Sequence, residues 1–153
     1  MVGATPFWLA ARFSEAAVLR LLVAHGADPL FVHHGDKVVE GRAGEGFPHR
    51  YETTTALLAA TGMGGGGEPW VEVARSEREP STLEAVKLLV ELGVDVNAAN
   101  TDGRTALDAA KTLKYESVAS FLTEHGAKPG VKKGPIVADR DKDAPLSRQD
   151  SQQ

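Results

Sequence analysis

Apolar residues recur at helical spacing in three segments of the chain, and each segment ends at a glycine. Within each segment the apolar positions fall three or four residues apart, as they do on the buried face of an amphipathic helix. Glycine readily takes the left-handed conformation that commonly closes a helix. The pattern therefore predicts three helices. They cover about residues 15–25, 82–92 and 116–125 and are closed by Gly26, Gly93 and Gly126.

A second, shorter helix is predicted upstream of each of these, where a threonine precedes a run with two adjacent alanines. Thr5 before Pro6 is typical of an N-cap followed by proline at the first helical position. Thr105 and Asp108 have the spacing of a capping box. The repeated unit is therefore a pair of helices, and the adjacent alanines let neighbouring helices approach closely. The upstream helices lie near residues 5–11, 55–60 and 105–110.

The buried core is predicted at the apolar positions of all three helix pairs. Each pair has too few apolar residues for a core of its own, so its apolar face must be buried against neighbouring pairs. The side chains expected there are Leu9, Leu21, Leu22, Leu57, Val86, Leu89, Leu107, Val118 and Leu122.

These helix pairs resemble the ankyrin repeat, whose pattern is Thr-Pro-Leu-His-x-Ala-Ala, an apolar second helix, and then Gly-Ala-Asp with a β-turn. The third unit matches best, because residues 95–105 look like the family's connector, with Asp102-Gly103 as the turn dipeptide. Two units have Thr-Ala in place of Thr-Pro, and none carries the family histidine. The resemblance implies an all-α solenoid of three helix pairs that spans residue 4 to about residue 129.

Two insertions are predicted within one repeat, because Gly26 and Gly93 are 67 residues apart whereas Gly93 and Gly126 are 33 apart. The connector before the middle pair and the segment between its two helices are each 17 residues longer than their counterparts in the third unit. The repeats then cover about residues 4–28, 53–95 and 101–128. The insertions cover about residues 29–54 and 61–80.

The first insertion has β character around a Gly-Asp turn, so we expect a long hairpin-like finger. The second insertion contains the glycine-rich residues 62–67, which predict a flexible loop. It lacks the Gly-Lys-Ser/Thr ending of a phosphate-binding loop. Trp70 either anchors this loop on the helices or is exposed for a partner. Ser81 with Glu84 has the spacing of a capping box and predicts where the following helix begins.

The two ends of the array differ from its middle. The first helix begins without a preceding connector, so we expect either an array cut from a longer one or a first unit that is a bare cap. Polar residues on the last helix indicate a C-terminal capping repeat. They are Ser117, Ser120 and Thr123. Residues 130–153 carry few apolar side chains among their prolines, lysines, aspartates and glutamines, so we expect a disordered tail.

Composition narrows the class of protein further. The 153 residues suffice for one domain, and no apolar run is long enough to span a bilayer. Residues 1–127 carry 11 Lys and Arg against 17 Asp and Glu, which disfavours a nucleic-acid partner. We expect no membrane association and a monomer. The chain has no cysteine, so the compartment stays open: the cytoplasm is favoured, and a secreted or periplasmic location remains possible.

Residues capable of metal binding or catalysis are few. The finger contains histidines and carboxylates that suit zinc or another transition ion, but adjacent histidines point to opposite sides of a strand. These candidates are His33, His34, His49, Asp36 and Glu52. His25 and His125 stand at matching places before the closing glycines, which favours a structural role. No Gly-x-Ser-x-Gly motif accompanies the serines, so we predict no metal, no cofactor and no enzyme activity.

The resemblance implies a noncatalytic module that binds a protein partner through its concave face and the finger. Aromatic and cationic residues are the expected contacts, since Tyr, Trp and Arg dominate interface energies. They are Phe31, His33, Arg42, Phe47, Arg50 and Tyr51 in the finger, with Trp8 on the first helix and Arg104 at the next connector. Two alternatives stay open: a regulatory or targeting fragment of a larger multidomain enzyme, and a metal- or ligand-binding domain that uses the finger histidines.

Overall fold

The computed structural model describes residues 3–38, 49–64 and 75–131. Within them lie six helices and one two-stranded sheet. In chain order the elements are α1 (Pro6–Arg12), α2 (Ala16–Ala24), β1 (His33–Val38), β2 (His49–Thr54), α3 (Ala56–Ala60), α4 (Arg75–Glu91), α5 (Ala106–Leu113) and α6 (Glu116–Glu124). None of these helices combines the length and the apolar content that crossing a bilayer needs.

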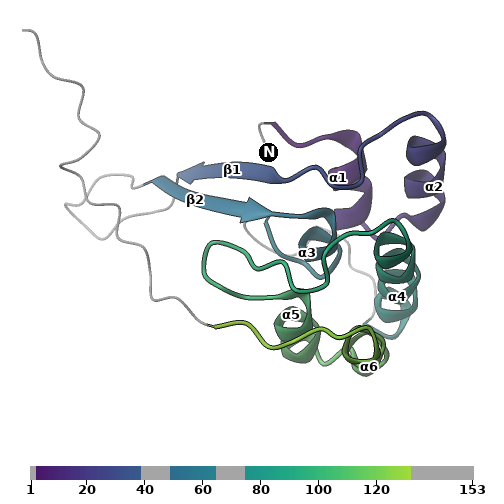
Figure 1. The fold of residues 1–153 in the computed structure, drawn as a ribbon, viewed down its shortest axis with the longest axis vertical. Helices are drawn as coiled ribbons and strands as arrows, with labels where there is room; N and C mark the ends of the chain where they lie inside the picture. The colour runs from purple at the N-terminus through teal and green to yellow at the C-terminus, as the bar shows by residue number, and fades with distance from the viewer. Residues whose placement is uncertain (1–2, 39–48, 65–74, 132–153) are drawn as a thin grey trace, which may run out of the picture.

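The helices form three pairs stacked in two columns, as Figure 1 shows. The first helices of the pairs, α1, α3 and α5, make one column, and α2, α4 and α6 make the other. The β1–β2 hairpin projects from the side of the molecule opposite the second column. The predicted solenoid of three helix pairs with a hairpin finger is confirmed. The predicted Gly-Asp turn of the finger is wrong, because Gly35 and Asp36 lie inside β1 and pair with Glu52 and Tyr51.

The predicted helix signals at both ends of the pairs are confirmed. The Thr5 hydroxyl accepts a hydrogen bond from the Trp8 amide at 3.2 Å, and Pro6 stands at the first helical position. The Asp108 carboxylate accepts a hydrogen bond from the Thr105 amide at 2.9 Å, as a capping box requires. The three closing glycines have positive φ angles, between +81° and +85°. Left-handed backbone at these three places is what glycine tolerates best.

The predicted start of α4 is wrong. The helix begins at Arg75, so residues 75–80, which we assigned to a loop, are helical and include Pro80. Ser81 therefore lies inside the helix, where its hydroxyl donates to the Glu77 carbonyl at 3.4 Å instead of capping an end. Proline is ordinarily excluded from helix interiors, but the arginines and glutamates before it favour helix. Trp70 and the glycines that follow Gly64 in the glycine run lie outside the described residues.

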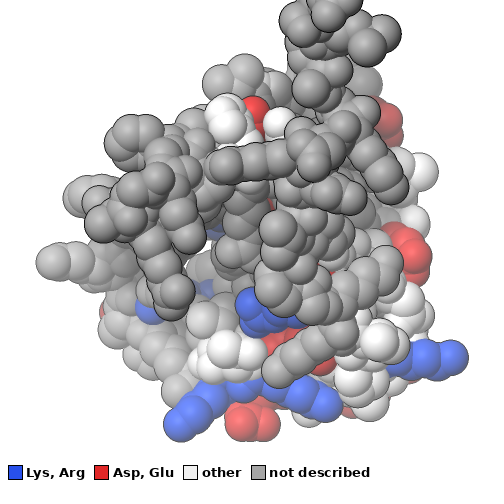
Figure 2. Space-filling model, turned by 90° about the vertical axis from the view of Figure 1, so that its left-hand side faces the viewer, with Lys and Arg blue, Asp and Glu red and all other residues white. Residues whose placement is uncertain are grey.

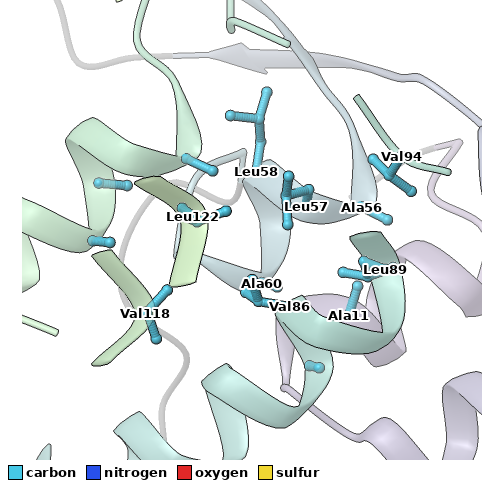
Figure 3. Packing of buried hydrophobic residues seen from close by; sticks show 14 of the residues in the cluster. Ala11, Ala56, Leu57, Leu58, Ala60, Val86, Leu89, Val94, Val118 and Leu122 are labelled. Atoms are coloured by element: carbon cyan, nitrogen blue, oxygen red, sulfur yellow. The ribbon is translucent and has the colours of Figure 1, made fainter. Parts of the chain in front are cut away.

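The core lies between the two columns of helices, and Figure 3 shows its packing. Leu57 of α3 faces Val86 and Leu89 of α4, and Val118 and Leu122 of α6 close the next layer. Six of the nine predicted core residues are buried: Leu57, Val86, Leu89, Leu107, Val118 and Leu122. Leu9 and Leu22 are only partly buried, and the prediction for Leu21 is wrong, since it is 58% exposed.

The described chain ends against the third helix pair. The Lys128 amide donates to the Asn97 side chain at 2.8 Å, and the Thr105 hydroxyl donates to the Lys128 carbonyl at 3.0 Å. The Gly130 amide donates to the Asp108 carboxylate at 2.8 Å. Gly130, which we assigned to the tail, therefore belongs to the folded part. The rest of the predicted tail, apart from Val131, lies outside the described residues.

Candidate functional site

The finger is an antiparallel hairpin whose register places His33 opposite Thr54 at the base and Val38 opposite His49 at the far end. Residues directly opposite each other point to the same side of a sheet, and side chains alternate along each strand. His33 therefore shares one side of the hairpin with Glu52 and Thr54. The other side carries His34, Asp36, His49, Tyr51 and Thr53.

The base of the hairpin is locked onto α1. The His33 side chain is 2% exposed, and its ring lies 4.6 Å from the Trp8 ring, centroid to centroid. Gly64, with a φ of +86°, closes the same cluster: a Cβ there would lie 2.6 Å from Thr54 Oγ1 and 2.8 Å from Trp8 Cζ2. Trp8 and Thr54 are themselves buried. Such close packing fixes the direction in which the finger leaves the helices.

Two of the predicted partner contacts are corrected by this cluster. Trp8 is fully buried and His33 almost so, so neither side chain is available to a partner. Both hold the finger in place instead. The sequence carried no signal for this pairing, because the two rings are 25 positions apart and meet only through the hairpin.

The side of the finger that carries Asp36, His49 and Tyr51, which we call its outer side, presents an exposed aromatic ring. Tyr51 is 63% exposed, and its ring stacks on the His49 ring at 6.4 Å with an interplanar angle of 24°. His49 Nδ1 lies 2.9 Å from one oxygen of Asp36 and 3.0 Å from the other. His34 Nδ1 lies 3.4 Å from the Thr53 hydroxyl. We call Asp36, His49 and Tyr51 the finger triplet.

Strand β2 of the finger is hydrogen-bonded to the connector of the third repeat. The Thr53 amide donates to the Thr101 hydroxyl at 2.9 Å, and the Asn100 side-chain amide donates to Glu52 at 3.3 Å. Burial lowers the pKa of the Arg12 guanidinium, and the Glu52 carboxylate offsets part of that effect. The connector of the third repeat therefore helps to hold the finger in place.

A cavity of about 330 Å³ lies at the other end of the inner helices, where α1, α3 and α5 turn into their partners. Its apolar wall includes Phe13, Met63, Leu113 and Tyr115, and its charged residues are Arg12, Glu15, Glu77, Arg78 and Arg104. Arg104 reaches it from the connector and donates to the Thr112 hydroxyl at 3.5 Å.

Of the other contacts predicted in the finger, the described residues include only Phe31 and Arg50. Phe31 is half-buried, whereas Arg42 and Phe47 lie outside the described residues. Arg50 stands in β2 opposite Lys37. Figure 2 shows the side of the molecule from which the finger projects, and the described charges visible there are of both signs.

The histidines considered for metal binding do not converge. His33 faces Trp8, and His34 and His49 have their own partners on the opposite side of the finger. In the described ranges, no three His, Asp or Glu side chains gather closely enough to hold a metal ion. His25 and His125 each place Nδ1 2.8 Å from the carbonyl four residues before, at Leu21 and Phe121. This repeated contact supports their structural role.

The comparisons of this chain with known proteins all point to ankyrin repeats. The family model of the ankyrin repeat matches residues 2–34. The fold is similar to a crystal structure of an ankyrin repeat domain from Acinetobacter baumannii, with 27% identity and a TM-score of 0.54 over 82% of this chain and 50% of that one. It is also similar to the human ASB11 ankyrin repeat domain, with 21% identity and a TM-score of 0.53 over 82% of this chain and 41% of that one.

This chain therefore spans half or less of the length of these two structures. Among curated proteins, no sequence matches it significantly.

Proposed function

This chain belongs to the ankyrin-repeat family, and on that premise we propose that it is a noncatalytic module that recognises a partner protein through the outer side of its finger. Ankyrin-repeat domains generally serve protein–protein interaction, and stacked repeats offer an extended surface for it. The specific surface is inferred from the contacts of this chain.

The observation that carries the proposal is the exposure of Tyr51 in an arrangement that is otherwise fixed. Its ring is held by stacking on His49, which is in turn held by Asp36. The base of the same hairpin is buried against Trp8. An exposed tyrosine held in one orientation loses little conformational entropy when a partner covers it, and tyrosine is enriched among the residues that dominate binding.

The other expected contacts stay part of the proposal by sequence alone. Phe31, Arg42, Phe47 and Arg50 come from the same insertion, and Arg104 lies on the connector of the next repeat. The described charges on this face of the molecule (Figure 2) are of both signs, which suits a partner whose surface also carries both.

The first experiment identifies the partner through the finger itself. A photo-crosslinking amino acid replaces Tyr51, and the matched control carries it at Glu124, which is exposed on the last helix. We expect discrete adducts from position 51 in extracts of the source cells and none of the same mass from position 124. An excess of the unmodified chain should compete the adducts away, whereas the Tyr51→Ala chain should not.

The second experiment measures affinity for the crosslinked partner once it has been purified. Tyr51→Ala should weaken binding at least about tenfold, equivalent to roughly 1.4 kcal/mol, with unchanged helical circular dichroism. Tyr51→Phe keeps the ring and should bind within about twofold of the parent. If Tyr51→Ala binds normally and only the melting temperature falls, the finger is a structural clasp and the proposal is wrong.

A further inference from the structure

The cavity at the turns of the three helix pairs is bounded on one side by the beginning of α4. Aligned on the closing glycines, α2 and α6 begin at positions that correspond to Leu83, whereas α4 begins at Arg75. Residues 75–82 therefore have no counterpart in the second helices of the other pairs, and we call them the α4 extension. Four residues of the α4 extension line the cavity: Glu77, Arg78, Ser81 and Thr82.

The α4 extension is hydrogen-bonded to both neighbouring pairs. Thr82 Oγ1 lies 3.2 Å from Ser14 Oγ in the turn between α1 and α2. Glu79 accepts hydrogen bonds from the Ser117 amide at 2.8 Å and from the Ser117 hydroxyl at 2.7 Å, at the start of α6. This wall of the cavity is therefore held in place before a ligand arrives, which lowers the entropic cost of binding.

Three arginines from separate elements line the cavity, and we call it the arginine cavity: Arg12 of α1, Arg78 of α4 and Arg104 of the connector before α5. Arg12 is buried and donates to the Met63 carbonyl at 3.5 Å, and the other two arginines are half-buried. Taking a charged group out of water is costly. The Glu52 carboxylate offsets only part of the effect of burial on the pKa of Arg12. An anion in the cavity would offset more of it.

These arginines are not part of the repeat pattern. Aligned on the capping threonines, Arg12 corresponds to Gly62 and Thr112, and Arg104 corresponds to two uncharged residues. Arg78 lies in the α4 extension. A side chain that supports the repeat itself tends to recur, as the histidines before two of the closing glycines do. Because the three arginines occur once each and line one cavity, we assign them to binding.

The negative charges at the cavity limit the charge of the ligand. Glu15 and Glu77 also line it, but both are exposed, so water weakens their fields more than those of the less exposed arginines. The helices α1, α3 and α5 end at the cavity, and carbonyl groups at a helix end carry partial negative charge. Three positive side chains against two negative ones and these helix ends suit an anion with one charge and disfavour a polyphosphate.

The remaining wall of the arginine cavity is apolar. It includes Phe13, Met63, Leu113 and Tyr115. The volume of about 330 Å³ is at the lower end of the range for ligand cavities, so it suits a small molecule or one residue of a larger one. A guanidinium group recognises a carboxylate through two parallel hydrogen bonds. A carboxylate on an aromatic or aliphatic body therefore matches both parts of the lining.

We propose that the arginine cavity binds a monocarboxylate with an apolar body, either a free organic acid or the C-terminal residue of a polypeptide. The arginines hold the carboxylate, and the apolar wall covers the body. The inference does not rest on the proposed function of the finger, because the finger triplet does not line this cavity.

The test is isothermal titration calorimetry of the full 153-residue chain with 3-phenylpropionate. We expect a dissociation constant below about 1 mM. The neutral 3-phenylpropanamide has the same body and should bind at least about tenfold more weakly. A tripeptide that ends in phenylalanine with a free carboxylate distinguishes the two sources. Tighter binding than that of 3-phenylpropionate assigns the cavity to a polypeptide end, and weaker binding assigns it to a free acid.

Substitutions then locate the acid within the chain. Arg104→Gln and Arg78→Gln should each weaken binding at least about tenfold. The matched control is Lys111→Gln, which removes the same charge at an exposed position of α5 outside the cavity and should bind like the parent. Glu77→Gln should strengthen binding about twofold, because it removes a negative charge at the cavity. Circular dichroism should be unchanged in all four variants, since none of these side chains is fully buried.

Three results would overturn the proposal. The first is no binding of 3-phenylpropionate at concentrations up to about 10 mM. The second is equal binding of the acid and the amide, which would mean that the apolar wall alone attracts the ligand. The third is an equal effect of Lys111→Gln and the two arginine variants, which would indicate a general influence of the net charge instead of a site.

Discussion

Leu22 and Leu89 occupy the same position in the first and second helix pairs, four residues before the closing glycine. Leu89 is completely buried, whereas Leu22 is only partly buried. The same contrast separates Val18, at 41% exposure, from Ala85 and Val118, which are fully buried. The local sequence is similar at each position, so the difference comes from the neighbours: the second pair has one on each side and the first has only one in the described chain.

This contrast predicts where the free energy of folding is concentrated. In a stack of repeats, stability is approximately a sum of terms for single repeats and terms for the interfaces between them. The second pair takes part in two interfaces, whereas the outer side of the first pair takes part in none within the described residues.

The largest expected effect belongs to Leu89→Ala, which should reduce the free energy of unfolding by roughly 2–5 kcal/mol. Removing a fully buried leucine loses its burial and leaves a cavity in the core. Leu22→Ala, its matched control, should cost about half as much or less, because part of that side chain already contacts water. Urea denaturation followed by circular dichroism measures both. Equal losses of unfolding free energy in the two variants would contradict the contrast between the first and second pairs.

A smaller effect concerns the helix caps of the first and third pairs. Asp108→Ala should cost about 1 kcal/mol near neutral pH, since it removes the carboxylate that accepts the amides of Thr105 and Gly130. Thr5→Ala should cost a similar amount by removing the cap of α1. Both are measured by urea denaturation, and the two variants should differ in their dependence on pH.

The pH dependence follows from the Asp108 carboxyl. Burial would raise its pKa, but the hydrogen bonds from Thr105 and Gly130 and the charge of Arg104 outweigh burial, so the pKa lies below the ordinary value of 3.8. Its contribution is then present above about pH 4 and is lost as the pH falls through the folded-state pKa. The difference between parent and Asp108→Ala should shrink in acid. A difference that stays constant down to pH 2 would contradict this assignment.

The sequence predicted the features that depend on local chemistry. The threonine caps, the capping box and the closing glycines were all recognisable, because a cap needs particular residues at fixed spacing. The helix pairing followed from the repetition of these signals. The hairpin was expected from β character, but its turn was misplaced, because Gly35 and Asp36 lie inside β1 and pair with Glu52 and Tyr51.

Features that depend on distant neighbours were missed or misjudged. Leu21 was predicted to be buried from its helical spacing, but only a preceding repeat would cover it. Trp8 and His33 were predicted as exposed contacts, yet they meet each other at the base of the finger. Ser81 matched a capping pattern that the longer α4 does not use. Spacing along the chain reveals neither burial nor contacts between segments.

Hydrogen exchange of α2 and α4 tests the central claim most directly, because it compares the first pair with the second in one molecule. The amides of Ala16–Ala24 should exchange at least tenfold faster than those of residues 82–91. The expected reason is that α2 is packed on one side and α4 on both. Equal protection of the two helices would contradict the account, since it would mean that an outer neighbour is not needed to stabilise the first pair.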